Sequence, residues 1–322
     1  MKIIYTLLFI AIYLNANSIL DEYRLNGLSA IEEKLDMELS KKAYWDNVLK
    51  DKDTRFGYSE QYDSFLICDK NTSKLTFYKH DENKTFIKKR EYDAFTGKIN
   101  GDKQREGDLK TPIGVYEINK RLNKDTKLDP FYGPLAFVTS YPNLYDKMRG
   151  KNGSGIWLHG LPINQERDDF TKGCIAIDNQ SIECLDRNIK INTTALVIYP
   201  NKPKTSSKEK LSSILSQLYD WRYAWLYNDL EKYLSYYSDD FKRPDGMNFK
   251  TFSKYKTRVF EKSEKKKIKF SNINVIEYPA TENVYQITFE EYYKSDTFEF
   301  NGEKVLLVRL EDSNKLKIFI EK

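Results

Sequence analysis

Two short stretches decide how this sequence is interpreted: GIWLHG at residues 155–160 and TKGCI at residues 171–175. The first is an apolar run that ends in His159-Gly160, and the second places Cys174 directly after a glycine. A thiol nucleophile needs a base within hydrogen-bonding reach and backbone N–H groups for the oxyanion, which a preceding glycine exposes at little steric cost. Because a lone cysteine is more often a small buried hydrophobe, this pair needs support from its surroundings.

The surrounding segments have the pattern of a β-rich domain. SFLIC at 64–68 and LTFY at 75–78 flank the polar turn DKNTS at 69–73, which predicts a hairpin. KTPIGVYEI at 110–118 is expected to be a turn that runs into a strand. Further strands are expected at 85–94, 155–160, 175–177 and 195–199, and a helix at 179–187.

With these elements in order, residues 64–199 resemble the catalytic domain of the L,D-transpeptidase family, also called YkuD. KTPIG at 110–114 resembles the TPxG turn of that family, HG at 159–160 its HG motif, and TKGC at 171–174 its [ST]HGC motif. The resemblance implies the following site: Cys174 as nucleophile, His159 as its base, Gly160 as the carbonyl that orients the imidazole, and Gly173 with Cys174 as oxyanion donors. Thr171, Lys172 and Trp157 lie beside these residues and are candidates for substrate binding.

Two positions depart from the family pattern. Lys172 stands where the motif has histidine, and Ala176 stands where it has arginine two residues after the cysteine. A cationic Lys172 could lower the pKa of the thiol or pair with a substrate carboxylate, and it could equally be a solvated loop lysine. Both departures change the groups around the acyl-enzyme, where an acceptor strand would have to bind.

The N-terminus has the layout of a secretory signal peptide. Lys2 precedes a short apolar run at 3–14, and NANS at 15–18 supplies small polar residues, so we predict a signal peptide at 1–17 that is cleaved after Ala16. An uncleaved anchor is the alternative. No other stretch approaches the ~20 apolar residues of a spanning helix, so we expect a periplasmic protein without stable membrane insertion.

Residues 18–60 are expected to form a helical segment. Leucine and isoleucine recur at three- and four-residue steps, at positions 25, 28, 31, 35 and 39. This apolar stripe could pack on the following domain, 61–202, or form a homodimer contact, and the sequence does not decide between them.

The region after residue 202 is predicted to be a separate α+β domain, 206–322. PNKPKTSS at 200–207 has the composition of a linker. A helix is expected from Leu211 to about Tyr237, ending before DDF at 239–241, and a second helix at 248–261. Strands are expected at 268–278, 284–294, 304–311 and 315–320. This domain resembles the NTF2-like fold, in which Lys304 would line a pocket or else extend its side chain to the edge of the sheet.

The composition of the chain argues against nucleic acid and metal ions as binding partners. The net charge is only +5 with both signs interspersed, whereas nucleic-acid binding needs a concentrated basic patch. Only 2 histidines and no CxxC make a zinc site improbable, and no cofactor is expected. Cys68 and Cys184 are predicted to be core residues, with a disulfide between them as a minor alternative, and His80 a surface residue.

The departures, the signal peptide and the C-terminal domain together resemble a narrower group, the peptidoglycan L,D-carboxypeptidases that set cell shape in helical Gram-negative bacteria. The resemblance implies removal of the terminal D-Ala from tetrapeptide stems by a cysteine nucleophile. An L,D-transpeptidase that cross-links stems is the rival from the same class. A non-catalytic peptidoglycan-binding scaffold is the rival from another class, and the presence of both Cys174 and His159 disfavours it.

Overall fold

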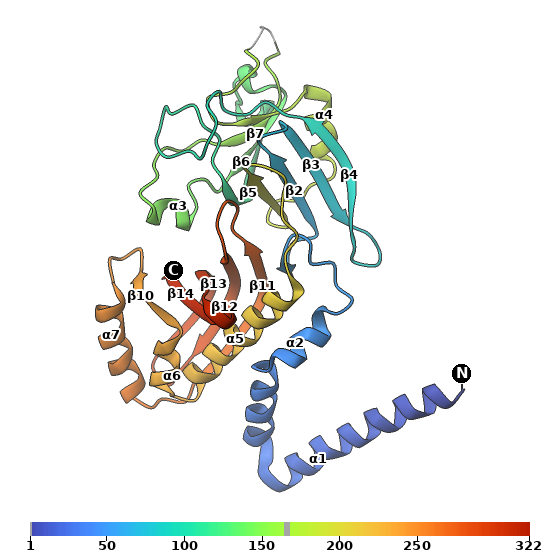
Figure 1. Ribbon diagram of the computed structural model, residues 1–322, viewed down its shortest axis with the longest axis vertical. Helices are drawn as coiled ribbons and strands as arrows, with labels where there is room; N and C mark the ends of the chain where they lie inside the picture. Colours follow the sequence, from blue (N-terminus) through green and yellow to red (C-terminus); the bar gives the residue numbers. More distant parts are fainter. Residues whose placement is uncertain (1, 164–167) are drawn as a thin grey trace.

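The computed structural model describes residues 2–163 and 168–322, and for residues 2–18 only the course of the backbone. Figure 1 shows two domains, with the N-terminal helix projecting from the lower one. The first domain holds the strands between residues 64 and 199, and the C-terminal domain holds those between 237 and 321. The predicted fold class is confirmed: a β-rich domain, an α+β domain and a helical N-terminal segment.

The first domain is built on an 8-stranded sheet with the order β4-β3-β2-β9-β5-β6-β7-β8. The strands are β2 (Ser64–Asp69), β3 (Lys74–His80), β4 (Phe86–Asp93), β5 (Gly114–Asn123), β6 (Leu135–Thr139), β7 (Trp157–His159), β8 (Ile175–Ala176) and β9 (Thr194–Tyr199). Two helices accompany them, α3 (Leu144–Met148) and α4 (Asn179–Asp186). The predicted hairpin and helix 179–187 are confirmed, whereas β6 and α3 were not predicted.

The central strands bury both faces, which explains their unbroken apolar sequence. Leu66 and Cys68 of β2 lie in the core of the first domain, while Phe65 and Ile67 point the other way into a second cluster. This interdomain cluster consists of Phe56, Tyr62, Phe65, Ile67, Phe86, Val115, Ala195, Val197, Ile276, Tyr278, Leu307 and Ile320. The two domains therefore share buried apolar surface.

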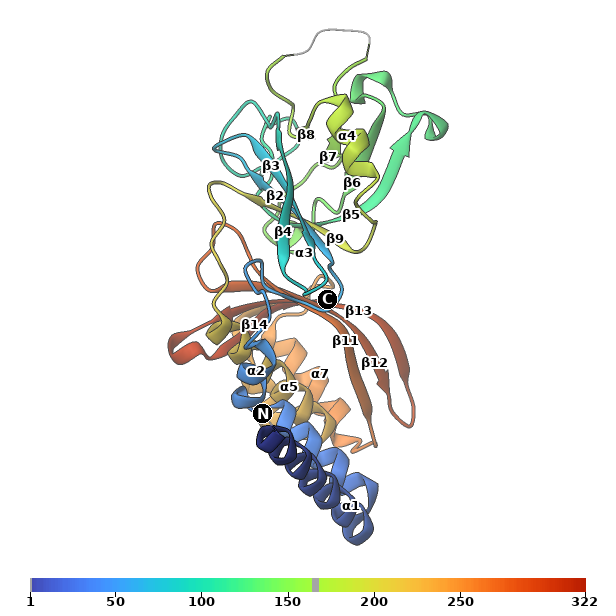
Figure 2. The ribbon, with the colours of Figure 1, turned by 90° about the vertical axis from the view of Figure 1, so that its right-hand side faces the viewer.

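The C-terminal domain has a 6-stranded sheet with the order β1-β11-β12-β13-β14-β10. Its strands are β1 (Tyr58–Ser59), β10 (Tyr237–Lys242), β11 (Lys267–Glu277), β12 (Val284–Lys294), β13 (Glu299–Leu310) and β14 (Leu316–Glu321). Figure 2 shows this curved sheet between the first domain and the helices α5 (Lys208–Leu226), α6 (Leu230–Ser235) and α7 (Phe249–Glu261). Successive side chains of β13 point to opposite faces of the sheet. Leu306 and Val308 pack with the helices, and Leu307 points to the other face and joins the interdomain cluster.

One predicted helix was wrong. The expected helix from Leu211 to about Tyr237 is broken after Leu226, and DDF at 239–241 lies in strand β10. The chain turns at Asn228, which adopts a left-handed φ of 63° that asparagine tolerates, and the Asp229 side chain then caps α6. Strand β10 pairs in parallel with β14, whereas β11, β12, β13 and β14 pair antiparallel, so the sheet is mixed.

The N-terminal segment joins the C-terminal domain. Helix α1 (Lys2–Leu39) bends at Gly27, and α2 (Lys42–Leu49) buries Trp45 and Leu49 in the core of the C-terminal domain. The helical segment thus ends at residue 49, and β1 then pairs with β11. The predicted signal peptide, 1–17, lies outside the described side chains, and Met1 outside the described backbone.

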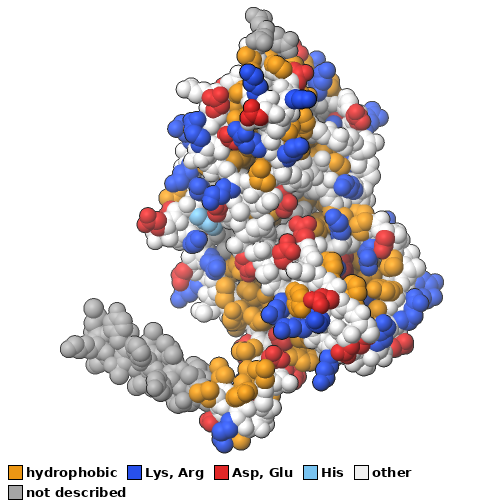
Figure 3. All heavy atoms as spheres, turned by 180° about the vertical axis from the view of Figure 1, so that it is seen from behind, with side chains coloured by type: hydrophobic (Ala, Val, Ile, Leu, Met, Phe, Trp, Pro, Cys, Tyr) orange, Lys and Arg blue, Asp and Glu red, His pale blue; other side chains and the backbone are white. Residues whose placement is uncertain are grey.

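Helix α1 contacts α5 through polar groups. Asp36 accepts a hydrogen bond from Arg222 at 2.8 Å, while the apolar stripe stays largely outside, with Leu25 67 % and Leu28 60 % exposed. Within the described residues, no helix is long and apolar enough to cross a membrane. Figure 3 shows basic and acidic side chains mixed over the rear face.

Two side-chain predictions needed correction. Cys68 is fully buried as expected, but Cys184 is only half-buried because Ile182 and Leu185 form the buried face of α4. His80 is also half-buried, since its ring stacks on Phe86 with centroids 3.8 Å apart.

Candidate active site

Two short parallel strands bring the candidate base and nucleophile together. Strand β7 pairs with β8 so that His159 lies opposite Ala176, and Ile177 N–H donates to the His159 carbonyl at 3.0 Å. Cys174 immediately precedes β8, on the turn that enters it. His159 and Cys174, which are 15 positions apart in the sequence, therefore lie at neighbouring strand ends.

The thiol lies against the backbone of the segment before β7. Its sulfur is 3.4 Å from the Gly155 carbonyl, and the Trp157 N–H donates to it at 3.5 Å. The two backbone contacts fix the position of the sulfur, whose thiolate is the nucleophilic form. Cys174 is half-buried, so it remains within reach of solvent.

The imidazole of His159 is held in one tautomer. Its Nδ1 lies 2.6 Å from the Gly160 carbonyl oxygen, the contact expected from the resemblance. A carbonyl can only accept, so Nδ1 carries the hydrogen of the neutral ring and Nε2 is the basic nitrogen. The side chain is 3 % exposed, and burial limits its rotation.

Glycine is required at position 160 for reasons of space. A Cβ there would lie 2.4 Å from Asn179 Oδ1 and 2.9 Å from Pro134. Asn179, the first residue of α4, accepts from Leu161 N–H at 2.7 Å and so fixes the chain after the histidine. Sequence reasoning missed this asparagine, although its place at the start of a predicted helix was visible.

Tyr132 is a second residue that the sequence did not reveal. Its ring packs edge-to-face on His159 at 5.1 Å and against Trp157 at 4.8 Å. Burial, and next the proximity of Cys174, raise the pKa of Tyr132 above its ordinary value. The Tyr132 ring therefore covers one side of the His159 imidazole, and Trp157 packs beside it.

The turn before the nucleophile is shaped by Thr171. Its hydroxyl donates to the Cys174 carbonyl at 2.6 Å and accepts from the Gly173 N–H at 3.0 Å. Gly173 has a φ of 135° and packs on the Lys110 carbonyl, so a side chain there would be strained. The Gly173 N–H is thus engaged in this state, and its role as an oxyanion donor stays a prediction.

The TPxG-like turn at 110–114 supports the loop 171–174 that carries Cys174. Buried Thr111 accepts from the Gly97 N–H at 2.8 Å, and Gly97 forms a bridge with Thr171. Thr171 N–H also donates to the Thr96 carbonyl at 2.8 Å. The motif therefore supports Cys174 indirectly, because Thr111 holds the segment of Thr96 and Gly97 to which Thr171 is bonded.

The remaining predicted residues fall in different places. Lys172 is exposed beside Cys174, and Ala176 is fully buried with its N–H donating to the Phe95 carbonyl at 2.9 Å. Lys304 lies in the C-terminal domain, on β13 between β12 and β14, so it lines a cavity and is not at a sheet edge. Within 2–163 and 168–322, no group of three or more His, Cys, Asp and Glu is arranged to hold a metal ion.

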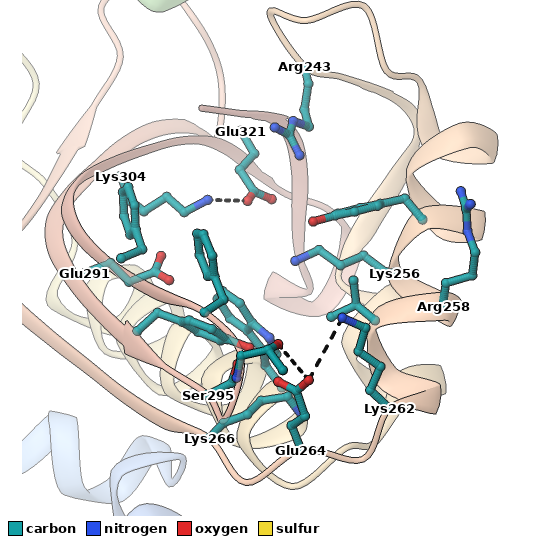
Figure 4. Close-up of a pocket in the computed structure, with 17 residues that line it drawn as sticks. Arg243, Lys256, Arg258, Lys262, Glu264, Lys266, Glu291, Ser295, Lys304 and Glu321 are labelled. Carbon is teal, nitrogen blue, oxygen red and sulfur yellow. Dashed lines mark hydrogen bonds and ion pairs between the residues drawn. The ribbon is translucent and has the colours of Figure 1, made fainter.

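The cavity of the C-terminal domain has a volume of about 810 Å³ and opens between β12, β13 and α7. Figure 4 shows Lys304, Lys256 and Arg243 directed toward Glu321 at its inner end. Lys304 Nζ donates to Glu321 Oε1 at 2.6 Å, and Lys256 lies 4.4 Å from the Trp225 ring centroid. Its outer part is lined by aromatic and basic side chains, among them Tyr255, Arg258, Lys262, Phe298 and Phe300.

Burial governs the charges inside this cavity. It raises the pKa of Glu291 to about 7 and lowers the pKa of Lys256 to about 8. Burial would also raise the pKa of Glu321, but attraction to Lys304 and Lys256 outweighs it and the pKa falls to about 2. Glu291 Oε2 has no hydrogen-bond partner among the described residues. The cavity can thus receive both an anionic and a cationic group.

Family profiles match both domains. Residues 63–198 match the L,D-transpeptidase catalytic domain (YkuD), and residues 213–322 match the Cds6 C-terminal NTF2-like domain. The expected resemblances are thereby confirmed.

Two solved structures resemble nearly the whole chain. A variant of the helical cell shape determining protein Pgp2 from Campylobacter jejuni is 37 % identical, with a TM-score of 0.82 over 89 % of this chain and 99 % of that one. Bd1075 from Bdellovibrio bacteriovorus is 29 % identical, with a TM-score of 0.66 over 84 % and 96 %. The YafK protein of Escherichia coli, which carries the name of an L,D-transpeptidase, is 34 % identical over 84 residues, 26 % of this chain and 29 % of its own length.

Proposed function

Since this chain belongs to the L,D-transpeptidase (YkuD) family, we propose that it is a periplasmic peptidoglycan L,D-carboxypeptidase that removes D-Ala from tetrapeptide stems. The observation that supports the proposal is the pairing of β7 with β8, which sets the strand of His159 next to the strand that Cys174 precedes, together with the contact that orients the imidazole. The 37 % identity to a cell-shape determinant across both domains favours a role in cell shape.

The geometry supports a two-step mechanism. His159 takes the proton of the Cys174 thiol, and the thiolate attacks the carbonyl of the residue before D-Ala. The oxyanion is stabilised by backbone N–H groups of the turn at Cys174, and His159 returns the proton to the amine of D-Ala, which leaves. His159 then takes a proton from water, whose oxygen attacks the thioester and releases the tripeptide and the thiol.

The departures at positions 172 and 176 favour water as the acceptor. Ala176 is fully buried and offers no cation to an incoming stem, while Lys172 projects into solvent next to the thiol. A transpeptidase must hold a second stem long enough for its amine to attack, and these positions provide little for that purpose. Exposed Lys172 could still pair with the carboxylate of D-Ala.

Incubation of the purified protein with tetrapeptide muropeptides tests the proposal. We expect free D-Ala and tripeptides, with Cys174→Ala as the inactive control. Cross-linked dimers as the main product would replace the proposal by transpeptidation. Absence of both products would leave a wall-binding scaffold.

The C-terminal cavity is the second part of the proposal: it binds a peptidoglycan sugar or stem and raises the local substrate concentration. Lys304→Ala and Arg258→Ala should reduce pull-down on purified sacculi, while exposed Lys269→Ala on β11 should not. The rate of Cys174 alkylation should stay the same in all three. If both cavity variants bind sacculi as well as the wild type, the C-terminal domain has only a structural role.

A homodimer through α1 is also proposed, because Leu25 and Leu28 stay exposed on that helix. Light scattering of the wild type and of Leu25→Glu/Leu28→Glu would detect it. A monomeric wild type would contradict the idea.

A further inference from the structure

Tyr278 belongs to the C-terminal domain and is buried in the interdomain cluster, where it contacts the first domain. It follows the end of β11 at Glu277 and is 1 % exposed. Its hydroxyl accepts a hydrogen bond from Asn143 Nδ2 at 3.1 Å, and its ring packs edge-to-face on Tyr145 at 4.8 Å. The Arg149 guanidinium lies 5.5 Å from the same ring. Tyr278 therefore lies against both ends of α3: against Asn143, which caps its N-terminus, and near Arg149, which follows its last residue.

The hydroxyl of Tyr278 also lies against the glycine of the turn 111–114. A Cβ on Gly114 would be 2.4 Å from the Tyr278 oxygen and 2.7 Å from the Tyr116 oxygen. The φ of Gly114 is not left-handed, so the glycine is needed here for space and not for conformation. The turn and the tyrosine from the other domain are thus fitted to each other.

A group of four charges, which we call the α3 charge cluster and of which Asp146 and Lys151 are buried, connects the same tyrosine to the other side of the turn. It consists of Asp102, Asp146, Arg149 and Lys151. Asp146 is fully buried and accepts from Tyr116 at 3.0 Å and Lys151 at 2.8 Å. Lys151 also pairs with Asp102, whose Oδ1 accepts from the Ile113 N–H of the turn at 2.8 Å.

The turn transmits its position to the nucleophile. Thr111 holds Gly97, Gly97 bridges to Thr171, and the Thr171 hydroxyl is bonded to the Cys174 carbonyl. In addition, Gly173 packs on the Lys110 carbonyl. Each link is a contact between buried or half-buried groups, and packed interiors transmit displacements because they have few voids.

We propose that Tyr278 is a positioning residue for Cys174: it fixes the turn 111–114, on which the loop of the nucleophile rests. The active site is therefore completed by a side chain of the C-terminal domain, which acts through the turn without touching substrate. This inference rests on the proposed role of Cys174 as nucleophile. It is independent of whether water or an amine accepts the acyl group.

The test uses the full-length chain and a readout that needs no substrate. The rate of Cys174 alkylation by iodoacetamide is measured from pH 5 to 10 in a Cys184→Ser background, since Cys68 is buried. Tyr278→Ala should slow alkylation at pH 7 by about threefold or more and shift the midpoint of the pH profile. It should lower kcat by about tenfold or more with little change in KM, because small misplacements of reacting groups are costly. Tyr278→Phe should show a smaller effect in the same direction.

Leu307→Ala is the matched control. Leu307 is fully buried in the same interdomain cluster, but it lies on β13, near the C-terminal end of that strand. It should lower Tm and leave the alkylation profile and kcat unchanged at temperatures where the protein is folded. A wild-type profile in Tyr278→Ala, or equal changes in the two variants, would overturn the proposal.

A double-mutant cycle decides the matter if Tyr278→Ala does not fold. Gly114→Ala should slow alkylation in the wild type, and the loss should be smaller in the Tyr278→Phe background, where the nearer hydroxyl is gone. The same loss in both backgrounds would contradict the inference. Failure to release D-Ala would refute only the carboxypeptidase, because alkylation is measured without substrate.

Discussion

Replacement of Glu291 by glutamine should stabilise the protein at alkaline pH. Glu291 is 1 % exposed on β12, its Oε2 has no partner among the described residues, and burial raises its pKa to about 7 from the ordinary 4.5. The folded state therefore binds a proton more tightly than the unfolded state. The stability that this proton provides is fully present below pH 4.5 and is lost as the pH rises through 7.

The size of the effect follows from the two pKa values. A tenfold change in proton affinity is worth about 1.4 kcal/mol, so the full loss between pH 4.5 and pH 8 is at most about 3 kcal/mol. Glutamine cannot ionise but still has unsatisfied polar atoms, so we expect Glu291→Gln to gain about 1–2 kcal/mol over the wild type at pH 8. Near pH 4.5 the two proteins should be about equally stable.

Urea unfolding of wild type and variant at pH 5, 6, 7 and 8 gives the comparison. Glu290→Gln is the control, because adjacent residues of a strand face opposite sides and Glu290 does not line the cavity. A constant stability difference at all four pH values would refute the raised pKa. A variant less stable than the wild type at pH 8 would show that the carboxylate is needed there by Lys304 and Lys256.

The remaining predictions concern the active site. Cys174→Ala should abolish D-Ala release by at least about 10³-fold with an unchanged circular dichroism spectrum, and activity retained in this variant would exclude the mechanism. His159→Ala should lower kcat by about 10²–10⁴-fold, measured by the same release assay. EDTA should leave the rate unchanged while iodoacetamide stops it, and loss of activity on chelation would indicate a metal. Gly173→Ala should cost about 1–3 kcal/mol of stability in urea, because its φ is left-handed and the Lys110 carbonyl blocks the new Cβ, and wild-type stability would refute that strain.

The sequence predicted the strands with clear apolar runs and missed elements whose signal is non-local. The hairpin at 64–80 and the helices α4 and α7 follow directly from alternation, turn residues and caps. Strand β10 was missed, because YSDDFK at 237–242, where the predicted helix ends, has no clear apolar alternation. Its state is set by parallel pairing with β14, about 80 residues later, which local pattern does not contain.

The site residues that belong to recognisable sequence motifs could be predicted. Cys174, His159 and Gly160 follow from the family pattern, and the contact between His159 and the Gly160 carbonyl is present. Tyr132 and Asn179 were missed because each comes from a loop or helix end that only the tertiary fold brings to the imidazole. The expected core position of Cys184 failed because one residue along a helix rotates a side chain by about 100°.

The pairing of β1 with β11 makes the first domain an insertion within the C-terminal one. Tyr58 pairs with Val275, and Trp45 packs in the same core as Leu211 and Ile318, so that core is assembled from both sides of the inserted domain. A nascent chain can finish the first domain while the other still lacks its last strands, and contacts of such long sequence separation form slowly. A recombinant boundary at 200–207 alone would therefore divide one core between two fragments, and a clean excision of either domain requires a second cut near residue 60.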